Sequence, residues 1–283
     1  MKRILFLTAG LLVLAACNKQ DPEPAILEEH LTEGYIVYHM DQYSVAKMKD
    51  GKWWMTQNMR YIPEGFTPSE DLTAVTAGIF YPLMINAENT AAQFINDPAA
   101  IRANGYLYQA EVVLGLKVGD LTSVEAAEAL NGAQGICPEG WHVPTSDDII
   151  NLVGKAVSPL ATNDKAPYYD GKNGSISLLN ADRFNMDAFG AVSIIDNTKE
   201  AGTFMGWAKN YPEKLSSGMF CGSTYAGVTY NTKDDASSGI KNLQFYGFMP
   251  MTNKATEAEY TCNGSKVSYR IAAPLRCVRN SAE

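Results

Sequence analysis

The stretch from Cys137 to Asp148 constrains the fold of this chain more than any other. Its sequence is Cys-Pro-Glu-Gly-Trp-His-Val-Pro-Thr-Ser-Asp-Asp. Pro138 and Pro144 each fix a backbone angle, and Gly140 permits a tight bend between them. A cysteine, a tryptophan and a helix start so close together predict a structural anchor and not an active site.

A helix is expected to begin within this anchor. Thr145 and Asp148 have the T-x-x-[DE] spacing of a capping box. Apolar residues then recur on one helical face, at Ile149, Leu152, Val153 and Val157. Pro159 should end the helix. We take Trp141, His142, Pro144 and Thr145 as the anchor residues, and we expect His142 to bond to backbone groups and not to act as a general base.

The N-terminus is typical of an export signal. Lys2 and Arg3 precede an apolar run over residues 4–16 that is too short to span a membrane as a mature helix. The run ends in Leu-Ala-Ala-Cys, which resembles the bacterial lipoprotein signal, in which the cysteine is acylated. We therefore predict a signal peptide at 1–16, lipidation of Cys17, and a flexible tether over 17–34 that holds the domain off the membrane.

The residue after Cys17, the net charge and the hydropathy of the chain limit where the protein can be located and what it can bind. Asn18 follows the cysteine, which favours the outer membrane, and the lipid-anchored domain could face the cell surface or the periplasm. The chain has 23 basic and 31 acidic residues, a formal net charge of −8. An acidic chain without a basic stripe is a poor nucleic-acid binder. No later stretch is long and apolar enough to be a transmembrane helix.

Four cysteines remain once Cys17 is assigned to lipid. They are Cys137, Cys221, Cys262 and Cys277. In an exported chain an even set predicts two disulfides, and three connectivities are open. A zinc site is the alternative, but no pair has Cys-x-x-Cys spacing.

Hairpin and strand signals flank the anchor. Residues 44–48 and 52–56 surround Asp50-Gly51, which predicts a hairpin with a type I′ turn. Of Trp53 and Trp54, one should face the core and the other should face the opposite way. Between about 63 and 135 the sequence is irregular, with two short helices expected after caps at Asp97 and Thr122. Other short strands are expected at 35–38, 189–195, 218–221, 244–251, 267–272 and 275–279.

Four stretches together resemble a known family. They are Gly51–Arg60, Asn104–Tyr108, the anchor at Cys137–Asp148, and the Arg-Cys-Val-Arg ending at 276–279. The chain is similar to the Fibrobacter succinogenes major paralogous domain, a family of exported bacterial lipoproteins, over roughly residues 35–280. The resemblance implies an α+β, C-type lectin-like fold with a small, loop-rich antiparallel sheet, flanking helices and disulfides. It implies a single domain at 35–283 with an insertion at about 63–135.

The resemblance also implies a disulfide pairing. A cysteine beside the first helical region bonded to one in the last strand would join Cys137 to Cys277. Cys221 and Cys262 would then form an additional pair. Cys221 lies where the family tends to show Trp-Ser-Ser-Thr and this chain has Phe-Cys-Gly-Ser-Thr at 220–224, so this second pair departs from the family pattern.

The sequence contains no convincing catalytic constellation. We expect a non-enzymatic ligand-binding or adhesion module that binds a glycan or a protein through loops on a rigid scaffold. Candidate contacts are aromatic or polar residues of expected loops: Tyr168, Tyr169, Asp170, Asn173, Trp207, Tyr225, Asn231 and Asp234. No cofactor is expected, although the Asn231–Asp235 turn could hold calcium.

Two other functions stay open. The anchor and the C-terminal ending are also similar to the fold of formylglycine-generating enzymes, copper oxidases that need two reactive cysteines; a free Cys262 or Cys277 would favour that interpretation. The third alternative is a structural subunit of a surface assembly, which an exposed apolar edge would favour.

Overall fold

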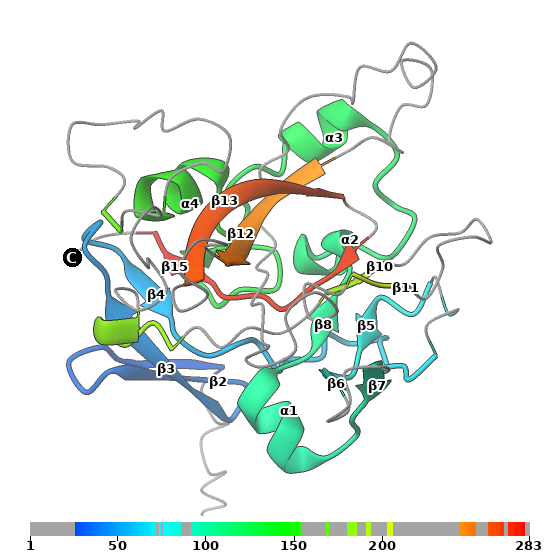
Figure 1. The fold of residues 1–283 in the computed structure, drawn as a ribbon, viewed down its shortest axis with the longest axis horizontal. Coiled ribbons are helices and arrows are strands. Elements are labelled where there is room, and N and C mark those ends of the chain that lie inside the picture. Colours follow the sequence, from blue (N-terminus) through cyan, green and yellow to red (C-terminus); the bar gives the residue numbers. More distant parts are fainter. Residues whose placement is uncertain are drawn as a thin grey trace, which may run out of the picture.

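A computed structural model describes residues 26–71, 74, 76–85, 92–153, 168–169, 180–185, 191–193, 203–205, 244–252, 260–268 and 271–280 of the chain. These residues form antiparallel sheets and a few short helices, an α+β arrangement (Figure 1). The strands are β1 (Leu27–His30), β2 (Tyr35–Tyr38), β3 (Asp41–Lys47), β4 (Trp53–Met55), β5 (Ile79–Phe80), β6 (Leu83–Ile85), β7 (Ala92–Phe94), β8 (Leu107–Tyr108), β9 (Trp141–His142), β10 (Ala191–Ser193), β11 (Thr203–Met205), β12 (Gln244–Thr252), β13 (Tyr260–Ser268), β14 (Ile271–Ala272) and β15 (Val278–Arg279). The helices are α1 (Pro98–Asn104), α2 (Ala110–Val113), α3 (Val124–Glu128) and α4 (Ser146–Val153).

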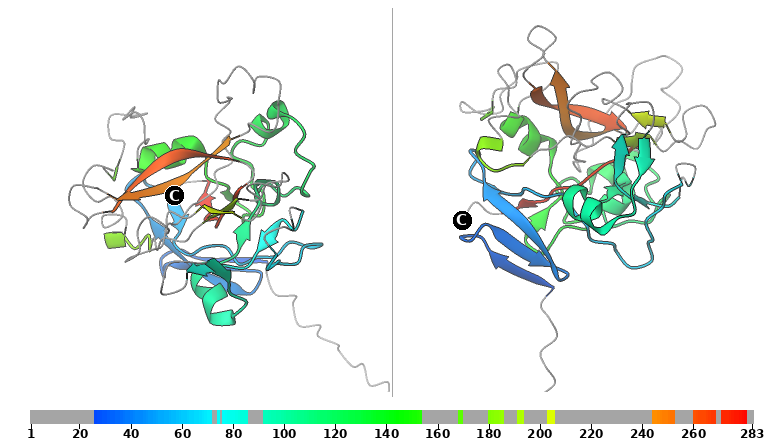
Figure 2. Two further views of the ribbon diagram at one scale, coloured as in Figure 1. Left: turned by 45° about the vertical axis from the view of Figure 1, so that its right-hand side comes forward. Right: turned by 60° about the horizontal axis from the view of Figure 1, so that its bottom comes forward.

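The main sheet has six strands in the order β1-β2-β3-β4-β15-β9, and every neighbouring pair is antiparallel. Its two outermost strands contact each other through side chains. Glu29 of β1 accepts a hydrogen bond from the Trp141 indole of β9 at 2.8 Å. Glu29 also forms an ion pair with Arg279 of β15, at 3.0 Å. A flat sheet could not bring these strands together, so the sheet is curled; its blue and red strands can be followed in Figure 2.

The tether is shorter than expected, because part of it forms strand β1. Residues 17–34 were predicted to be flexible, but Leu27–His30 pairs with all of β2, with His30 opposite Tyr35. The segment lacks strand periodicity because it is an edge strand whose middle residues, Glu28 and Glu29, are exposed. Residues 27–30, which the tether was expected to include, are therefore part of the main sheet.

The hairpin at Asp50-Gly51 is confirmed, but its predicted turn type is wrong. β3 pairs with β4, with Lys47 opposite Trp53. Within the turn only Gly51 has a positive φ, of 83°, and its amide donates to the Met48 carbonyl at 2.9 Å. This is a longer hairpin loop with one left-handed glycine, because Asp50 does not adopt the positive φ that a type I′ turn requires. The expected alternation is confirmed: Trp54 is fully buried and Trp53 half-buried.

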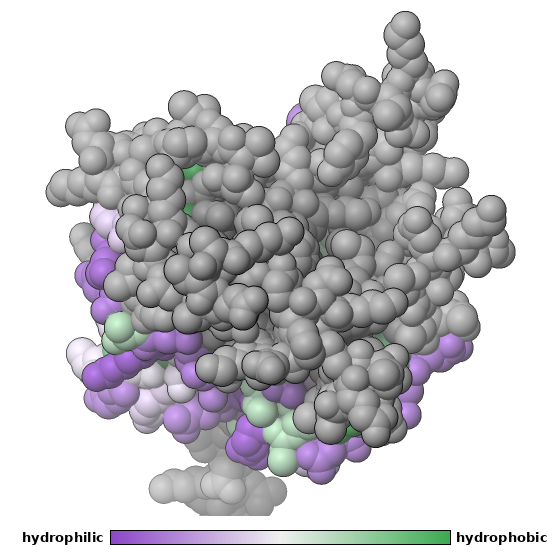
Figure 3. Space-filling model, viewed as in Figure 1, coloured by the Kyte–Doolittle hydropathy of each residue, from purple (hydrophilic) through white to green (hydrophobic). Residues whose placement is uncertain are grey.

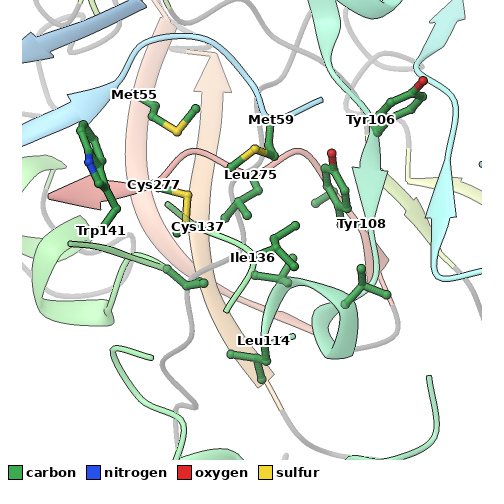
Figure 4. Close-up of a cluster of buried hydrophobic side chains, with 14 of the residues drawn as sticks. Met55, Met59, Tyr106, Tyr108, Leu114, Ile136, Cys137, Trp141, Leu275 and Cys277 are labelled. Atoms are coloured by element: carbon green, nitrogen blue, oxygen red, sulfur yellow. A yellow bond between two sulfur atoms is a disulfide. The ribbon is translucent and has the colours of Figure 1, made fainter. Parts of the chain in front are cut away.

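The larger core cluster fills the inside of the curl. It contains Met55, Tyr108, Trp141 and Leu275, with the Cys137–Cys277 disulfide among them (Figure 4). The sulfur atoms are bonded at 2.06 Å, which confirms the expected pairing. Cys262 lies in β13 opposite Pro250, and Cys221 lies outside the described residues, so the second pairing stays a prediction.

The smaller core cluster joins α4 to the other face of the sheet. Ile149, Leu152 and Val153 of α4 are buried with Trp54 and Val278. α4 also lies beside the long β12–β13 hairpin (Figure 1). The predicted helix face is confirmed as far as Val153; Val157 and Pro159 lie outside the described residues.

The helix caps follow the sequence with one exception. The Asp97 carboxylate accepts from the Ala100 amide at 2.9 Å and caps α1, as predicted. For α3 the cap is Ser123 and not Thr122. The Ser123 hydroxyl accepts from the Ala126 amide at 3.1 Å, the short-range bond that an N-cap residue makes to the third helical residue.

Among the described helices, none has the length and apolar character needed to cross a membrane.

Candidate functional site

A groove of about 610 Å³ lies at the C-terminal end of β3. Residues from three separate segments line it: Leu31 and Thr32, then Lys47, Lys49 and Trp53, then Asp182 and Arg183. It opens because β2 pairs with β3 only as far as Tyr35 opposite Ser44. Beyond that point the turn at 31–34 replaces β2, and the Gly34 carbonyl accepts from the Val45 amide at 2.9 Å.

The second wall of the groove is held by a buried tyrosine. The Tyr169 hydroxyl donates to the Asp182 carboxylate at 2.6 Å and accepts from the Lys49 amide at 3.3 Å. The Lys49 ammonium lies 3.6 Å from Asp182 and 4.6 Å from the centre of the Tyr169 ring. Burial, and then the hydrogen bond to Asp182, raise the pKa of Tyr169 well above its ordinary value, so its hydroxyl keeps its proton as a donor.

These contacts correct the role expected for Tyr169. It was predicted to contact a ligand, but its side chain is fully buried and positions Lys49 and Asp182 instead. Tyr168 is half-buried, and its amide bonds to the Asn151 carbonyl at 3.0 Å. The other predicted contacts, Asp170, Asn173, Trp207, Tyr225, Asn231 and Asp234, lie outside the described residues.

The groove combines an aromatic ring with positive charge. Lys47 and Trp53 are directly opposite each other in the β3–β4 register, so their side chains lie on the same face of the sheet. Three basic side chains and one carboxylate line the groove, whereas the whole chain has a net charge of −8. An apolar ring with a few convergent polar groups is the usual composition of a small-ligand site, and the basic excess favours an anionic ligand.

A buried ionic network positions the turn that precedes Trp53. Asp148 of α4 is 2% exposed; its carboxylate contacts the Lys52 ammonium and lies 3.0 Å from His142 Nε2. It also accepts from the Thr145 amide at 2.8 Å, and the Thr145 hydroxyl accepts from the Asp148 amide at 3.2 Å, so the predicted capping box is confirmed. Asp50 completes the turn by accepting from the Trp54 indole at 3.0 Å.

The partners of His142 differ from those expected. Its Nδ1 lies 2.6 Å from the Asn280 side-chain oxygen, and its Nε2 faces Asp148, so both ring nitrogens meet side chains and not backbone groups. Although burial raises the pKa of Asp148, the hydrogen bond from His142 and the charge of Lys52 outweigh it and hold the pKa well below its ordinary value. The carboxylate is therefore ionised at neutral pH and stabilises the anchor.

No group of three or more His, Cys, Asp or Glu side chains in the described part of the chain could hold a metal ion. The Asn231–Asp235 turn, the candidate calcium site, is not among the described residues.

The four sequence stretches that carried the resemblance meet in space. Asn58 donates to the Asn104 carbonyl at 2.8 Å and accepts from Arg276 Nε, also at 2.8 Å. The Cys137–Cys277 disulfide and the pairing of Trp141 with Arg279 join the anchor to the C-terminal ending. These motif residues hold the fold together.

Residues 50–279 match the protein family described as the Fibrobacter succinogenes major domain. This chain belongs to that family. The matched segment contains the anchor, the disulfide, and both Trp53 and Arg183 of the groove. No curated protein and no solved structure matches the chain. The family match therefore supports the domain assignment but does not identify a ligand, so the evidence for a ligand comes from the groove.

Sequence reasoning placed Trp53 and Trp54 on opposite faces without saying which faces outward, and it missed Lys47, Lys49, Asp182 and Arg183. Asp182 and Arg183 are more than 130 positions away from Lys47 and Lys49. A charge pattern along the sequence could not reveal a cluster that only the tertiary fold assembles.

Proposed function

We propose that this member of the Fibrobacter succinogenes major domain family is an exported lipoprotein, anchored in the outer membrane through Cys17, that binds an acidic glycan in the groove beside Trp53. In this proposal the protein is not an enzyme: the domain is a rigid scaffold that presents a binding site. The lipoprotein signal at residues 1–17 supports the location, and the groove supports the activity.

The juxtaposition of Trp53 with Lys47, Lys49 and Arg183 carries the proposal. A tryptophan face packs against the apolar face of a sugar ring, while ammonium and guanidinium groups bind carboxylate or sulfate groups. Asp182 can accept hydrogen bonds from sugar hydroxyls, and its ties to Tyr169 and Lys49 keep it in place before a ligand arrives.

A C-type lectin-like relationship forms part of the proposal. In such domains the N- and C-terminal strands lie together, and here Glu29 and Arg279 form an ion pair between β1 and β15. The disulfide from the anchor to the C-terminal strand supports the same relationship. A shared fold alone does not imply sugar binding, so the proposed ligand is based on the residues that line the groove.

The disulfide also weighs against the copper-oxidase alternative. That chemistry needs two reactive cysteines, and Cys277, one of the two candidates, is bonded to Cys137. Thiol titration of the unfolded, unreduced protein should find Cys137, Cys221, Cys262 and Cys277 all oxidised. A titratable Cys262 would revive the enzymatic alternative.

The test is a glycan array probed with the mature chain carrying Cys17→Ser, in calcium and then in chelator. We expect binding to uronic-acid or sulfated glycans. Lys47→Glu, which reverses a groove charge, should weaken binding at least tenfold, and Trp53→Leu should do the same by removing the aromatic face. Lys117→Glu is the matched control, because it reverses an exposed lysine that does not line this groove. Equal binding by Lys47→Glu and Lys117→Glu, or a blank array, would refute the assignment.

A further inference from the structure

The exposed large apolar side chains in the described part of the chain gather at one place. They are Ile26, Met40 and Ile62, which are 64%, 82% and 36% exposed. The His39 amide donates to the Ile26 carbonyl at 2.9 Å, and the His39 ring stacks on Tyr61 at 4.0 Å between ring centres. Since Met40 follows His39 and Ile62 follows Tyr61, the three residues lie near one another, and we name this group the tip patch. The part of the surface that is coloured in Figure 3 is mostly hydrophilic, with a few pale green areas along its lower edge.

The tip patch is built on a strained turn. His39 and Met40 connect β2 to β3 with φ of 48° and 66°, a conformation that Asn-Gly adopts easily and that other side chains resist. Such strain persists only where the surroundings enforce it, and it is commonest at functional sites.

Neighbouring residues hold this turn in place. Arg60 donates to the Gln42 carbonyl at 2.6 Å, and its guanidinium lies 4.2 Å from the centre of the Tyr43 ring. The Tyr38 ring meets the Tyr61 ring edge to face at 5.3 Å. The patch is therefore rigid and presents Met40 outward.

We propose that the tip patch docks the domain onto the lipid bilayer that carries the Cys17 anchor, a proposal that rests on the lipoprotein function above. It replaces the expectation of a tether that holds the domain off the membrane. Apolar side chains beside tyrosines are the composition of membrane-interface surfaces, where the aromatic ring is buried and its hydroxyl stays hydrated.

The short chain between Cys17 and Ile26 favours the lipid bilayer as the partner of the tip patch. Cys17 lies nine positions before Ile26, and a fully extended chain spans at most about 3.3–3.6 Å per residue, or about 30 Å here. A domain of this size is about 45 Å across. The anchor cannot reach round to the far side, and the tether ends in the patch itself.

The negative charge of the chain favours apolar contact with the membrane over electrostatic contact. With a net charge of −8, the chain as a whole is repelled by an anionic surface. Asp41, next to Met40, lies 3.6 Å from Arg60 Nε and is thus partly neutralised. Docking is therefore apolar, is favoured on neutral lipid, and should not depend on salt.

Docking by the patch also orients the proposed binding groove. β3 begins at Asp41 beside the patch and ends at Lys47 in the groove. A seven-residue strand is about 23 Å long. The groove thus lies at the end of the strand that is farther from the docked patch.

The experiment uses the full, acylated chain in neutral phosphatidylcholine liposomes, with the photoreactive residue p-benzoylphenylalanine in place of Met40. Ile62 is the second test position. Ala129 is the control, because it is exposed and follows α3, which lies across the molecule from β2 and β3 (Figure 1). After irradiation, intact-mass spectrometry measures the mass of the protein, which shows whether Cys17 carries acyl chains and whether a lipid adduct has formed.

We expect at least tenfold more lipid adduct from positions 40 and 62 than from 129, at low and at high salt. An Ile62→Glu change should reduce the adduct at position 40. Acylated protein with equal adducts at all three positions would overturn the docking and leave the lipoprotein proposal standing. Cross-linking of position 40 to a second copy would assign the patch to self-association and overturn the docking. A mass without acyl chains would overturn both proposals.

Discussion

Replacing Asp148 with asparagine tests the ionic network under the anchor. Asparagine has nearly the same shape and can still accept from the Thr145 amide, so the change removes charge without creating a cavity. The carboxylate is buried and faces His142, Lys52 and Thr145 at once. We expect the variant to fold and to be less stable.

The magnitude follows from these contacts. A hydrogen bond to a charged group contributes about 1.5–3 kcal/mol, and the Lys52 contact is discounted because the Lys52 side chain is 39% exposed. Asp148→Asn should therefore lower the free energy of unfolding by about 1.5–3 kcal/mol at neutral pH. Asp148→Ala, which leaves the partners without any acceptor, should cost about 3–5 kcal/mol.

The effect should depend on pH with a defined sign. The pKa of Asp148 is lowered by folding from its ordinary value of 3.8, so the folded protein favours the ionised form. Its stabilisation is fully present above that value and is lost as the pH falls through the folded pKa. The stability difference between wild type and Asp148→Asn should therefore be constant above about pH 5 and shrink below about pH 4.

Urea denaturation of the mature, disulfide-intact protein at pH 7, 5, 4 and 3 measures this difference. Asp147→Asn is the matched control, because Asp147 lies in the same first turn of α4 but is exposed. The control should cost less than about 1 kcal/mol, the range of a surface charge near a helix N-terminus. An Asp148→Asn protein as stable as wild type at pH 7, or a difference that does not change down to pH 3, would refute the network as a source of stability.

Two further changes test the core. Replacing Cys137 and Cys277 together with alanine should lower stability by up to about 5 kcal/mol, the loop-closure value for residues 140 apart, measured by urea denaturation; a loss below about 1 kcal/mol would contradict the disulfide's role. Gly135→Ala should cost about 2–3 kcal/mol in the same assay, because its φ is 55° and an added Cβ would lie 2.0 Å from the Val113 carbonyl oxygen. Gly119→Ala is its control, since that glycine also has a positive φ but open space around it, and an equal cost for both would show that contact with Val113 is not the cause.

Features governed by neighbours in sequence were predictable. The Asp97 cap, the capping box of Asp148 and the hairpin around Gly51 each depend on contacts within five residues. The Cys137–Cys277 disulfide is a long-range contact, and it was predicted only because the family resemblance implied it.

Features governed by distant partners were missed. β1 has no apolar alternation because it is an edge strand with exposed middle residues, and its Glu29 pairs with Arg279, 250 positions later. The β2–β3 turn carried no Asn-Gly signal, because His39 and Met40 are held at positive φ by Tyr61 and Arg60. Strain that is enforced by tertiary contacts leaves no local pattern, so neither the tip patch nor the groove could be predicted.

The family match begins at residue 50, whereas the curled sheet begins earlier, at Leu27. β1, β2 and β3 all lie before that position, and they form half of the six-stranded sheet. Without them β4 would become an exposed edge, and the buried Trp141 indole would lose its Glu29 acceptor. Two of the three tip-patch residues, Ile26 and Met40, flank these strands, and one end of the groove is built from the same part of the chain. In this chain the segment between the proposed membrane tether and residue 50 thus completes the sheet and supplies residues on which the proposed orientation and binding depend.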